Sequence, residues 1–275
     1  MNRMVALLPL ALLAACSKAA EQGEPSEAAS SEASAAQATA QADPAATAAA
    51  APGAVAIDED GKLFHFAYSY PANAAGIPAL RAELEAEKDK ARTELVAQAK
   101  DGQKESKEGG YEYHPYDTVT EWTVVTDIPG WLSMKGEFYS FTGGAHGNSG
   151  TQPLLWDKAA NRRREPIALF ISPAALNAAL GPAYCAALNA ERSKRRQEKV
   201  DPNSGDEFDK CLAPSEVTIL LGSGDKAHFT RIGLIADPYM AGPYAEGDYE
   251  ITLPVNAAVL KAVKPEYRSM FAVGR

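Results

Sequence analysis

The segment of this sequence best suited to chemistry is a glycine-rich loop that contains one histidine. It spans residues 142–148 and reads TGGAHGN. Because glycine adopts backbone angles closed to other residues, Gly143 and Gly144 allow successive amides to face one way and form a small anion-binding concavity. His146 could donate into the same space. The alternative is a tight connection in which His146 hydrogen-bonds to the backbone and fixes the turn.

A second segment, residues 237–247, presents two tyrosines on a stiff backbone. It reads DPYMAGPYAEG, so two prolines and two glycines surround Tyr239 and Tyr244, and Glu246 comes near its end. Exposed tyrosines on a stiff loop give a large contact area at a small entropic cost, which is typical of protein-binding surfaces. The alternative is that the two tyrosines cap the core beneath the loop.

The remaining polar residues give little support to catalysis. No two of the four histidines have the spacing of metal ligands on a helix. The histidines are His65, His114, His146 and His228. No Gly-x-Ser-x-Gly sequence occurs, and Ser149 beside Gly150 is only a superficial match to a nucleophile near a base. Carboxylates occur at alternate positions in Glu246, Asp248 and Glu250. They could supply a pair like that of a glycosidase, but this alternation is more typical of a strand that faces solvent. We therefore expect no catalytic residue, no metal and no cofactor.

The N-terminus has the features of a bacterial lipoprotein signal peptide over residues 1–15. Arg3 precedes a short apolar stretch that is too short to span a membrane, and the signal ends in the letters LAAC, whose cysteine is Cys16. We expect Cys16 to carry the lipid. Because Ser17 rather than an aspartate follows, we expect the periplasmic side of the outer membrane if the cell is Gram-negative. Cleavage after Ala19, which would give a soluble secreted protein, is the alternative.

The composition favours a globular domain on a flexible tether. Residues 16–56 are rich in Ala, Ser and Glu and contain almost nothing to bury, so we expect them to be disordered. The chain has 275 residues and is 46% hydrophobic, so the remainder can bury one generous core or two modest ones. The formal net charge of −9, which becomes −10 when Arg3 is removed with the signal peptide, argues against nucleic acid and favours basic partners.

Two cysteines remain besides the one expected to carry lipid. They are Cys185 and Cys211, and export places them in a compartment where thiols oxidise. We expect a disulfide that joins a long helix to the segment after it. The alternative is two free thiols.

The hydrophobic periodicity predicts an α+β fold with antiparallel sheets and one long helix in each of two subdomains, residues 57–157 and 158–275. In the first we expect a strand at 62–70, a helix over 77–100 that stops at Asp101-Gly102, a mobile loop at 103–110, a hairpin of 117–126 and 131–141, and a strand at 151–156. In the second we expect a helix from Ser172-Pro173 to Arg196, a short helix at 206–212, strands at 217–221, 226–235 and 249–253, and a helical end at 256–271 broken at Pro265.

Basic residues gather where the second long helix is predicted to end, and they are Arg192, Lys194, Arg195, Arg196 and Lys199. Such a group suits the negative pole of a helix and needs no further role. A phosphate-binding site, joined by Arg162, Arg163 and Arg164, is the alternative.

Taken together, the two loops resemble a known family. The strand that ends in TGGAHG (142–147), followed in the second half by PYAEG (243–247), is similar to the RsiV/PdaC-like extracytoplasmic domain family, and the resemblance covers about Ile57 to Arg275. It implies a PdaC-like first subdomain and an RsiV-like second subdomain that together form a receptor for lysozyme, with no catalytic residue. The sigma-binding segment of RsiV and the deacetylase domain of PdaC are not found in the sequence, so the resemblance by itself implies neither signalling nor deacetylation.

Three functions are compatible with these features. The first is a membrane-anchored envelope lipoprotein that binds a lysozyme-type muramidase or peptidoglycan through the two loops. Its binding residues would be Gly143, Gly144, His146, Tyr239, Tyr244 and Glu246. The second is a deacetylase-related hydrolase acting on peptidoglycan or its acyl groups, with His146 as general base. The third is a structural spacer between membrane and wall, in which neither loop contacts a ligand.

The lipoprotein signal predicts that the mature chain is found in membranes and begins with an acylated Cys16. Mass spectrometry of the N-terminal peptide from membrane extracts measures this directly. An unmodified N-terminus recovered from cytosolic extract would contradict it.

Overall fold

The computed structural model describes residues 53–274. The predicted signal peptide, Cys16 and the predicted tether as far as residue 52 lie outside the described residues. Among residues 53–274, no helix is both long enough and apolar enough to cross a membrane.

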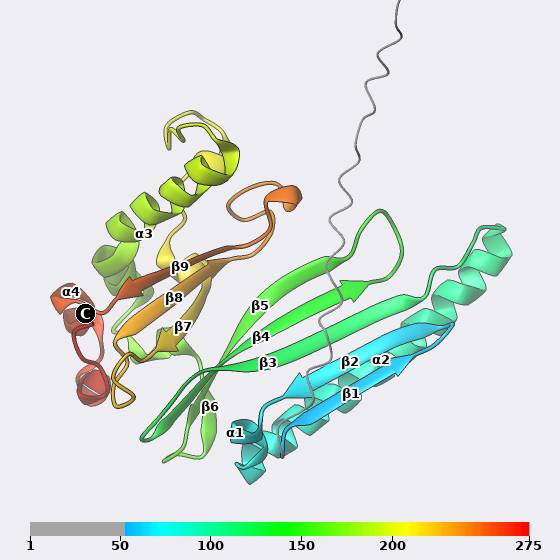
Figure 1. The fold of residues 1–275 in the computed structure, drawn as a ribbon, viewed down its shortest axis with the longest axis horizontal. Coiled ribbons are helices and arrows are strands. Elements are labelled where there is room, and N and C mark those ends of the chain that lie inside the picture. Colours follow the sequence, from blue (N-terminus) through cyan, green and yellow to red (C-terminus); the bar gives the residue numbers. More distant parts are fainter. Residues whose placement is uncertain (1–52, 275) are drawn as a thin grey trace, which may run out of the picture. The chain divides into compact units, whose positions relative to one another are not determined.

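A six-stranded mixed sheet forms the first half of the described chain (Figure 1). Its strands lie in the order β1 (Val55–Asp60), β2 (Phe64–Tyr70), β3 (Tyr116–Ile128), β4 (Trp131–Phe141), β5 (Asn148–Asp157) and β6 (Arg162–Arg164). Neighbouring strands are antiparallel except β2 and β3, which are parallel because helix α2 (Pro78–Gly109) carries the chain back between them. The α+β class and the hairpin of β3 and β4 are confirmed, whereas the expectation of purely antiparallel sheets is wrong at β2 and β3.

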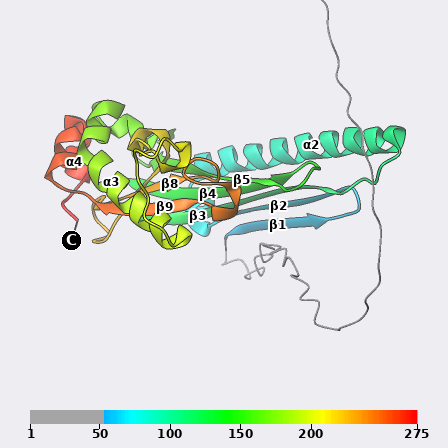
Figure 2. The same cartoon turned by 90° about the horizontal axis from the view of Figure 1, so that it is seen from above.

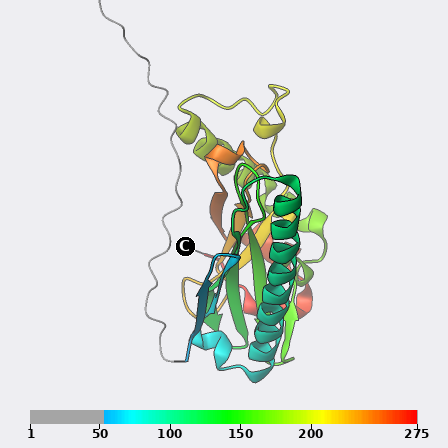
Figure 3. The same cartoon turned by 90° about the vertical axis from the view of Figure 1, so that its right-hand side faces the viewer.

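Helix α2, which follows the short helix α1 (Ala72–Ala75), covers one face of this sheet (Figures 2 and 3). Alternate strand residues point toward it, and the largest of them are aromatic. Phe66, Tyr68, Trp122 and Trp156 share this core and are each at most 2% exposed. Trp122 Nε1 donates to the Tyr68 hydroxyl at 3.1 Å, so their buried polar atoms satisfy each other. Burial of these rings fixes α2 on this face.

Helix α2 is longer than the sequence predicts. It runs to Gly109, and Gly110 ends it in the left-handed conformation, with φ 71° and its N–H donated to the Ser106 carbonyl. Gly102, the predicted stop, lies inside the helix. A glycine is needed there because a Cβ would overlap the side chain of Tyr116. The predicted mobile loop at 103–110 is therefore wrong: residues 103–109 are helical, Gly110 caps the helix, and Gly102 makes room for β3.

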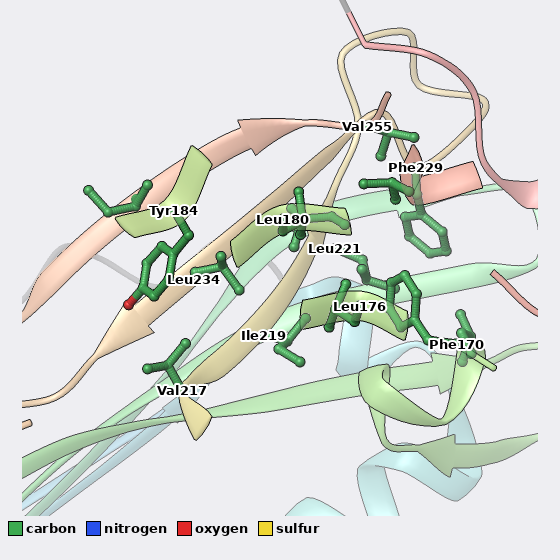
Figure 4. Close-up of a cluster of buried hydrophobic side chains, with 14 of the residues drawn as sticks. Phe170, Leu176, Leu180, Tyr184, Val217, Ile219, Leu221, Phe229, Leu234 and Val255 are labelled. Carbon is green, nitrogen blue, oxygen red and sulfur yellow. The ribbon is translucent and has the colours of Figure 1, made fainter. Parts of the chain in front are cut away.

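A three-stranded antiparallel sheet and two helices form the second half. Helix α3 (Pro173–Arg196) begins as predicted, since Ser172 Oγ accepts from the Ala175 N–H at 3.1 Å. The strands lie in the order β7 (Thr218–Gly222), β8 (Arg231–Ala236) and β9 (Tyr249–Pro254), and α4 (Ala257–Ala262) follows. Figure 4 shows the side chains packed between α3 and this sheet, among them Leu176, Leu180, Tyr184, Ile219, Leu221 and Leu234.

Short 3-10 turns connect these elements, and they are η1 (Pro166–Leu169), η2 (Glu207–Asp209), η3 (Pro214–Glu216), η4 (Tyr244–Glu246) and η5 (Pro265–Met270). The predicted helix at 206–212 is only the single turn η2. The predicted strand at 226–235 begins at Arg231, because the Asp225 carboxylate accepts from the amides of Ala227 and His228 and holds the preceding residues in a loop. The predicted break at Pro265 is confirmed, with α4 before it and η5 after it.

Two features of the large sheet extend beyond the predicted boundaries. Strand β1 is not among the predicted elements, and it includes Val55 and Ala56, the last residues of the predicted tether. The sheet also continues past residue 157 into β6, where Arg164 pairs with Asp157 at 3.1 Å. The first structural half thus spans Val55 to Arg164.

The two sheets pack directly on each other, since β7 lies against β3, β4 and β5. Thr218 Oγ1 of β7 donates to the Thr151 carbonyl of β5 at 2.9 Å. Ile128, Trp131 and Leu155 of the large sheet are buried in the same core as α3 and β7 to β9. Both halves therefore belong to one compact unit.

The predicted disulfide between Cys185 and Cys211 is present and joins α3 to the segment before η3. The two Cα atoms lie 5.2 Å apart, and 26 residues separate the cysteines in sequence. Closing a loop of this size contributes roughly 3 kcal/mol to stability in the chain-entropy account.

Gly136 of β4 tests the packing of this core. An added Cβ would lie 2.8 to 2.9 Å from three carbons of the Trp122 ring, which is buried and cannot move aside. Gly136→Ala should therefore lower the free energy of unfolding by about 1–3 kcal/mol in urea denaturation. The matched control is Gly222→Ala in β7, where the nearest atom lies 3.6 Å away and the expected change is below about 0.5 kcal/mol. Equal stability of the two variants would contradict this packing.

Candidate functional site

The two loops singled out in the sequence meet in space, although His146 and Tyr239 are 93 residues apart. The imidazole of His146 stacks on the ring of Tyr244, with centroids 4.2 Å apart and planes inclined by 18°. Tyr239 lies beside both rings, at 5.6 Å from Tyr244 and 6.5 Å from His146. We call these three residues the aromatic trio, residues 142–147 the histidine loop and residues 237–247 the tyrosine loop.

The structure supports the interpretation in which His146 hydrogen-bonds to the backbone and fixes the turn. Its Nδ1 lies 2.8 Å from the Gly147 carbonyl, which can only accept, so Nδ1 carries the proton and fixes the turn. Its Nε2 is then an acceptor, and it lies 3.4 Å from the Tyr239 hydroxyl. The histidine is nevertheless exposed, as are Gly143 and Gly144, whose φ angles of 94° and 95° require glycine. The loop therefore presents an oriented imidazole at the surface.

Tyr139 of β4 supports the histidine loop from below. A Cβ at Gly147 would overlap the Tyr139 ring, so the loop lies directly on this ring. Burial, followed by the nearby Asp117 carboxylate and Tyr244, raises the pKa of the Tyr139 hydroxyl above its ordinary value. Tyr139 thus connects the aromatic trio to the strands of the large sheet.

The tyrosine loop is held in an irregular shape. Tyr239 has a φ of 71°, a left-handed conformation that costs about 1 kcal/mol or more for a residue other than glycine. Its side chain is still 54% exposed, while Ala241 is buried and Tyr244 is half-buried. Backbone strain at an exposed tyrosine is typical of loops shaped for contact with a ligand.

The end of α3 holds the tyrosine loop in this shape. Arg196 forms two hydrogen bonds to the Glu246 carboxylate, at 2.8 and 3.1 Å, and a third to the Ala241 carbonyl at 3.2 Å. Glu246 also accepts from the Tyr249 hydroxyl. Burial acts to raise the pKa of Glu246, but the Arg196 guanidinium outweighs it and lowers that pKa. The Glu246 carboxylate, predicted as a ligand contact, is therefore occupied within the protein.

Two further arginines at the same helix end contact the tyrosine loop. Arg192 Nε donates to the Ala241 carbonyl at 2.8 Å, and Arg195 donates to the Glu246 and Asp248 carbonyls at 2.6 Å each. We call Arg192, Arg195 and Arg196 the arginine clamp. Because these guanidinium groups already have acceptors, the structure favours a supporting role over the alternative of a phosphate site.

The face of the large sheet opposite α2 is acidic. Glu59 of β1 pairs with Arg92 of α2 at 2.7 Å, so its neighbours along the strand point to the opposite face. On that face Lys135 lies 3.0 Å from Glu137 and 3.8 Å from Glu250 of β9. We call this surface the acidic face, and its carboxylates belong to Asp58, Asp60, Asp117, Glu121 and Glu137. It adjoins the aromatic trio through Tyr139.

Two of the other described histidines, His65 and His228, are engaged by carboxylates. His65 lies between Asp117, 2.7 Å from Nδ1, and Asp58, 3.1 Å from Nε2. Burial acts to lower the pKa of His65, but these two carboxylates outweigh it and raise that pKa. His228 Nδ1 lies 2.9 Å from Asp225. Across residues 53–274, no group of three or more His, Cys, Asp or Glu side chains is placed to hold a metal ion.

Comparison with known proteins agrees with the resemblance noted in the sequence. Residues 57–149 match the family model described as deacetylase PdaC, which confirms the predicted resemblance for the segment from β1 into β5. The match includes the histidine loop and ends before the tyrosine loop. No match was found among curated proteins.

Two solved structures of DUF3298 family proteins are similar to this chain. The one from Bacteroides fragilis has 19% sequence identity and a TM-score of 0.43, and the alignment covers 73% of this chain and 88% of that chain. The one from Pseudomonas aeruginosa has 17% identity and a TM-score of 0.44, with 81% and 96% covered.

The structure adds two groups to the site that the sequence analysis did not assign to it. Tyr139 lies in a strand whose alternation gave no hint of a role beneath a loop. The arginine clamp did leave a signal, because positions 192, 195 and 196 share one face of a helix at spacings of three and four. Their partners in the tyrosine loop lie some 50 residues further along the chain and could not be inferred from that spacing.

The stacking within the aromatic trio predicts a spectroscopic signature. A ring 4.2 Å from the imidazole shifts the proton resonances of His146, so Tyr244→Ala should move them toward the values of an unstructured histidine. Two-dimensional proton–carbon NMR of the histidine side chains measures this. Tyr111→Ala, at a tyrosine that is 61% exposed and outside the trio, should leave them in place. Unchanged His146 resonances in Tyr244→Ala would show that the rings do not stack.

Proposed function

We propose that this chain is a lipid-anchored, extracytoplasmic lipoprotein whose folded domain is non-catalytic and binds a lysozyme-type muramidase. The observation that carries the proposal is the aromatic trio, in which two loops from different sheets present one histidine and two tyrosines together. Tyrosines are enriched among the residues that contribute most to protein interfaces, because they bring large contact area at little entropic cost.

The rigidity of the trio supports binding. His146 is oriented by its own loop, and the tyrosine loop is held by the arginine clamp before any partner arrives. Side chains that are already ordered lose little further entropy on association, so more of the contact energy appears as affinity. An exposed tyrosine in a strained but fixed backbone therefore suits a preformed docking surface better than a spacer.

The charge of the domain supports a basic partner. The acidic face adjoins the trio, and the chain as a whole carries a formal charge of −9. Complementary charge raises the rate at which two proteins meet, and this advantage is screened by salt. Lysozyme-type muramidases are the basic partners that the resemblance to RsiV implies.

The sequence and the family match support a place in the cell envelope. The predicted lipoprotein signal supports a position on the periplasmic side of the outer membrane in a Gram-negative cell, at the end of a tether. The matching family model carries the name of a deacetylase. A peptidoglycan-acting hydrolase with His146 as general base is accordingly the second candidate, and the acceptor Nε2 of the exposed His146 favours it.

Binding to hen egg-white lysozyme tests the first candidate. The full mature chain should bind immobilised lysozyme at micromolar concentration or better, and more weakly as salt is raised. Tyr244→Ala should weaken binding about tenfold or more by removing a stacked ring from the centre of the surface. Tyr111→Ala is the matched control and should bind as the wild type does.

Two outcomes would contradict the proposal. The absence of binding at micromolar concentration would remove the lysozyme assignment. Cleavage or deacetylation of muropeptides by the same preparation, lost in His146→Ala, would establish the second candidate in its place.

A further inference from the structure

The disulfide lies about two helical turns from Arg192, the nearest residue of the arginine clamp, and Asn189 lies between them. Cys185 and Asn189 are on the same face of α3, and Asn189 Nδ2 lies 3.6 Å from Cys185 Sγ and 4.0 Å from Cys211 Sγ. On its other side, Asn189 Oδ1 accepts from Arg192 Nη1 at 2.9 Å. The sulfur pair and the buried guanidinium therefore share one side-chain amide.

Arg192 connects the disulfide segment to the tyrosine loop. Its Nη1 also donates to the carbonyls of the two residues before Cys211. The distances are 3.0 Å to Lys210 and 3.3 Å to Asp209. Its Nε donates to the Ala241 carbonyl of the tyrosine loop at 2.8 Å. A single guanidinium is thus hydrogen-bonded to both segments.

Burial makes this connection sensitive to the loss of an acceptor. Arg192 is 0% exposed, and its Nη2 already lacks an acceptor among the described residues. Burial, and then the nearby charge of Arg196, lower the pKa of Arg192, although an arginine remains protonated in proteins. A cation in this position cannot replace lost protein carbonyls with water unless the surrounding structure opens.

We propose that the Cys185–Cys211 disulfide positions the tyrosine loop through Arg192, so that the redox state of this cysteine pair sets the geometry of the aromatic trio. The claim that the disulfide regulates binding rests on the proposed function. The claim that the disulfide sets the shape of the tyrosine loop does not depend on the proposed function. Arg192 acts on the aromatic trio through the tyrosine loop and is therefore a positioning residue.

The chemistry requires a dithiol reductant. Reduction breaks the Sγ–Sγ bond, each sulfur takes up one electron and one proton to become a thiol, and the two thiols of the reductant become a disulfide. The covalent link between Cys211 and α3 is then lost, and the carbonyls of Asp209 and Lys210 are held against α3 by noncovalent contacts alone. Arg192 loses acceptors on one side, and Arg196 loses the fixed position of the Asp209 carboxylate, 2.7 Å away. Both arginines hold the tyrosine loop, so the loop loosens.

The experiment compares the full mature chain before and after reduction with dithiothreitol, with thiol titration to confirm that the bond is broken. His146 proton resonances report the trio without any ligand, and lysozyme affinity reports binding. After reduction the His146 resonances should move more than half of the way to their positions in Tyr244→Ala, and affinity should fall about tenfold or more. Arg192→Met with the disulfide intact should give the same displacement.

Two further variants keep the result interpretable. Asn189→Ala removes only the shared amide and should displace the His146 resonances in the same direction by a smaller amount. Arg163→Met removes a partly buried guanidinium in the other half, where it pairs with Glu87 at 2.7 Å, and should leave them unchanged. If Arg192→Met does not fold, reduction of the wild type and Asn189→Ala still decide the question.

The outcomes separate the two proposals. Displaced His146 resonances in a protein that binds no lysozyme in either redox state would support the positioning role and remove the proposed function. Resonances that stay in place when thiol titration shows full reduction would overturn the positioning role, whatever happens to binding.

Discussion

The described structure depends on satisfying one buried positive charge. Arg192 is 0% exposed, and a guanidinium removed from water costs several kcal/mol unless carbonyls and amides replace its hydration. Its acceptors come from three separate pieces of chain: Asn189 of its own helix, the carbonyls of residues 209 and 210, and the Ala241 carbonyl. Because one cation needs all of them together, the positions of helix, disulfide segment and tyrosine loop are set jointly.

This constraint explains how an irregular loop can hold two tyrosines in fixed positions beside His146. The histidine loop connects β4 and β5 of the large sheet, and the tyrosine loop connects β8 and β9 of the small one. Their rings stack at 4.2 Å in a structure in which β7 packs on β3, β4 and β5 and the arginine clamp holds the second loop. The aromatic trio is therefore a property of both halves together, and the segment that matches the PdaC family model supplies only His146.

Local signals in the sequence were enough for the features that depend on neighbouring residues. The cap at Ser172, the hairpin of β3 and β4 and the break at Pro265 follow from residue type and spacing. The end of α2 does not, because Gly102 serves to make room for Tyr116, a contact with a strand that comes later in the chain. The meeting of the two loops rests in the same way on contacts between residues far apart in sequence. The motifs identified both loops, whereas only the packing of the sheets brings His146 to Tyr244.

Hydrogen exchange of the oxidised chain, measured with and without a saturating amount of lysozyme, tests the central claim most directly. If the aromatic trio is the docking surface, the amides of the histidine loop (142–147) and the tyrosine loop (237–247) gain protection together in the complex. The exposed face of α2, on the other side of the large sheet, stays unchanged. Protection confined to α2, or to one of the two loops alone, would contradict the claim that they act as one surface.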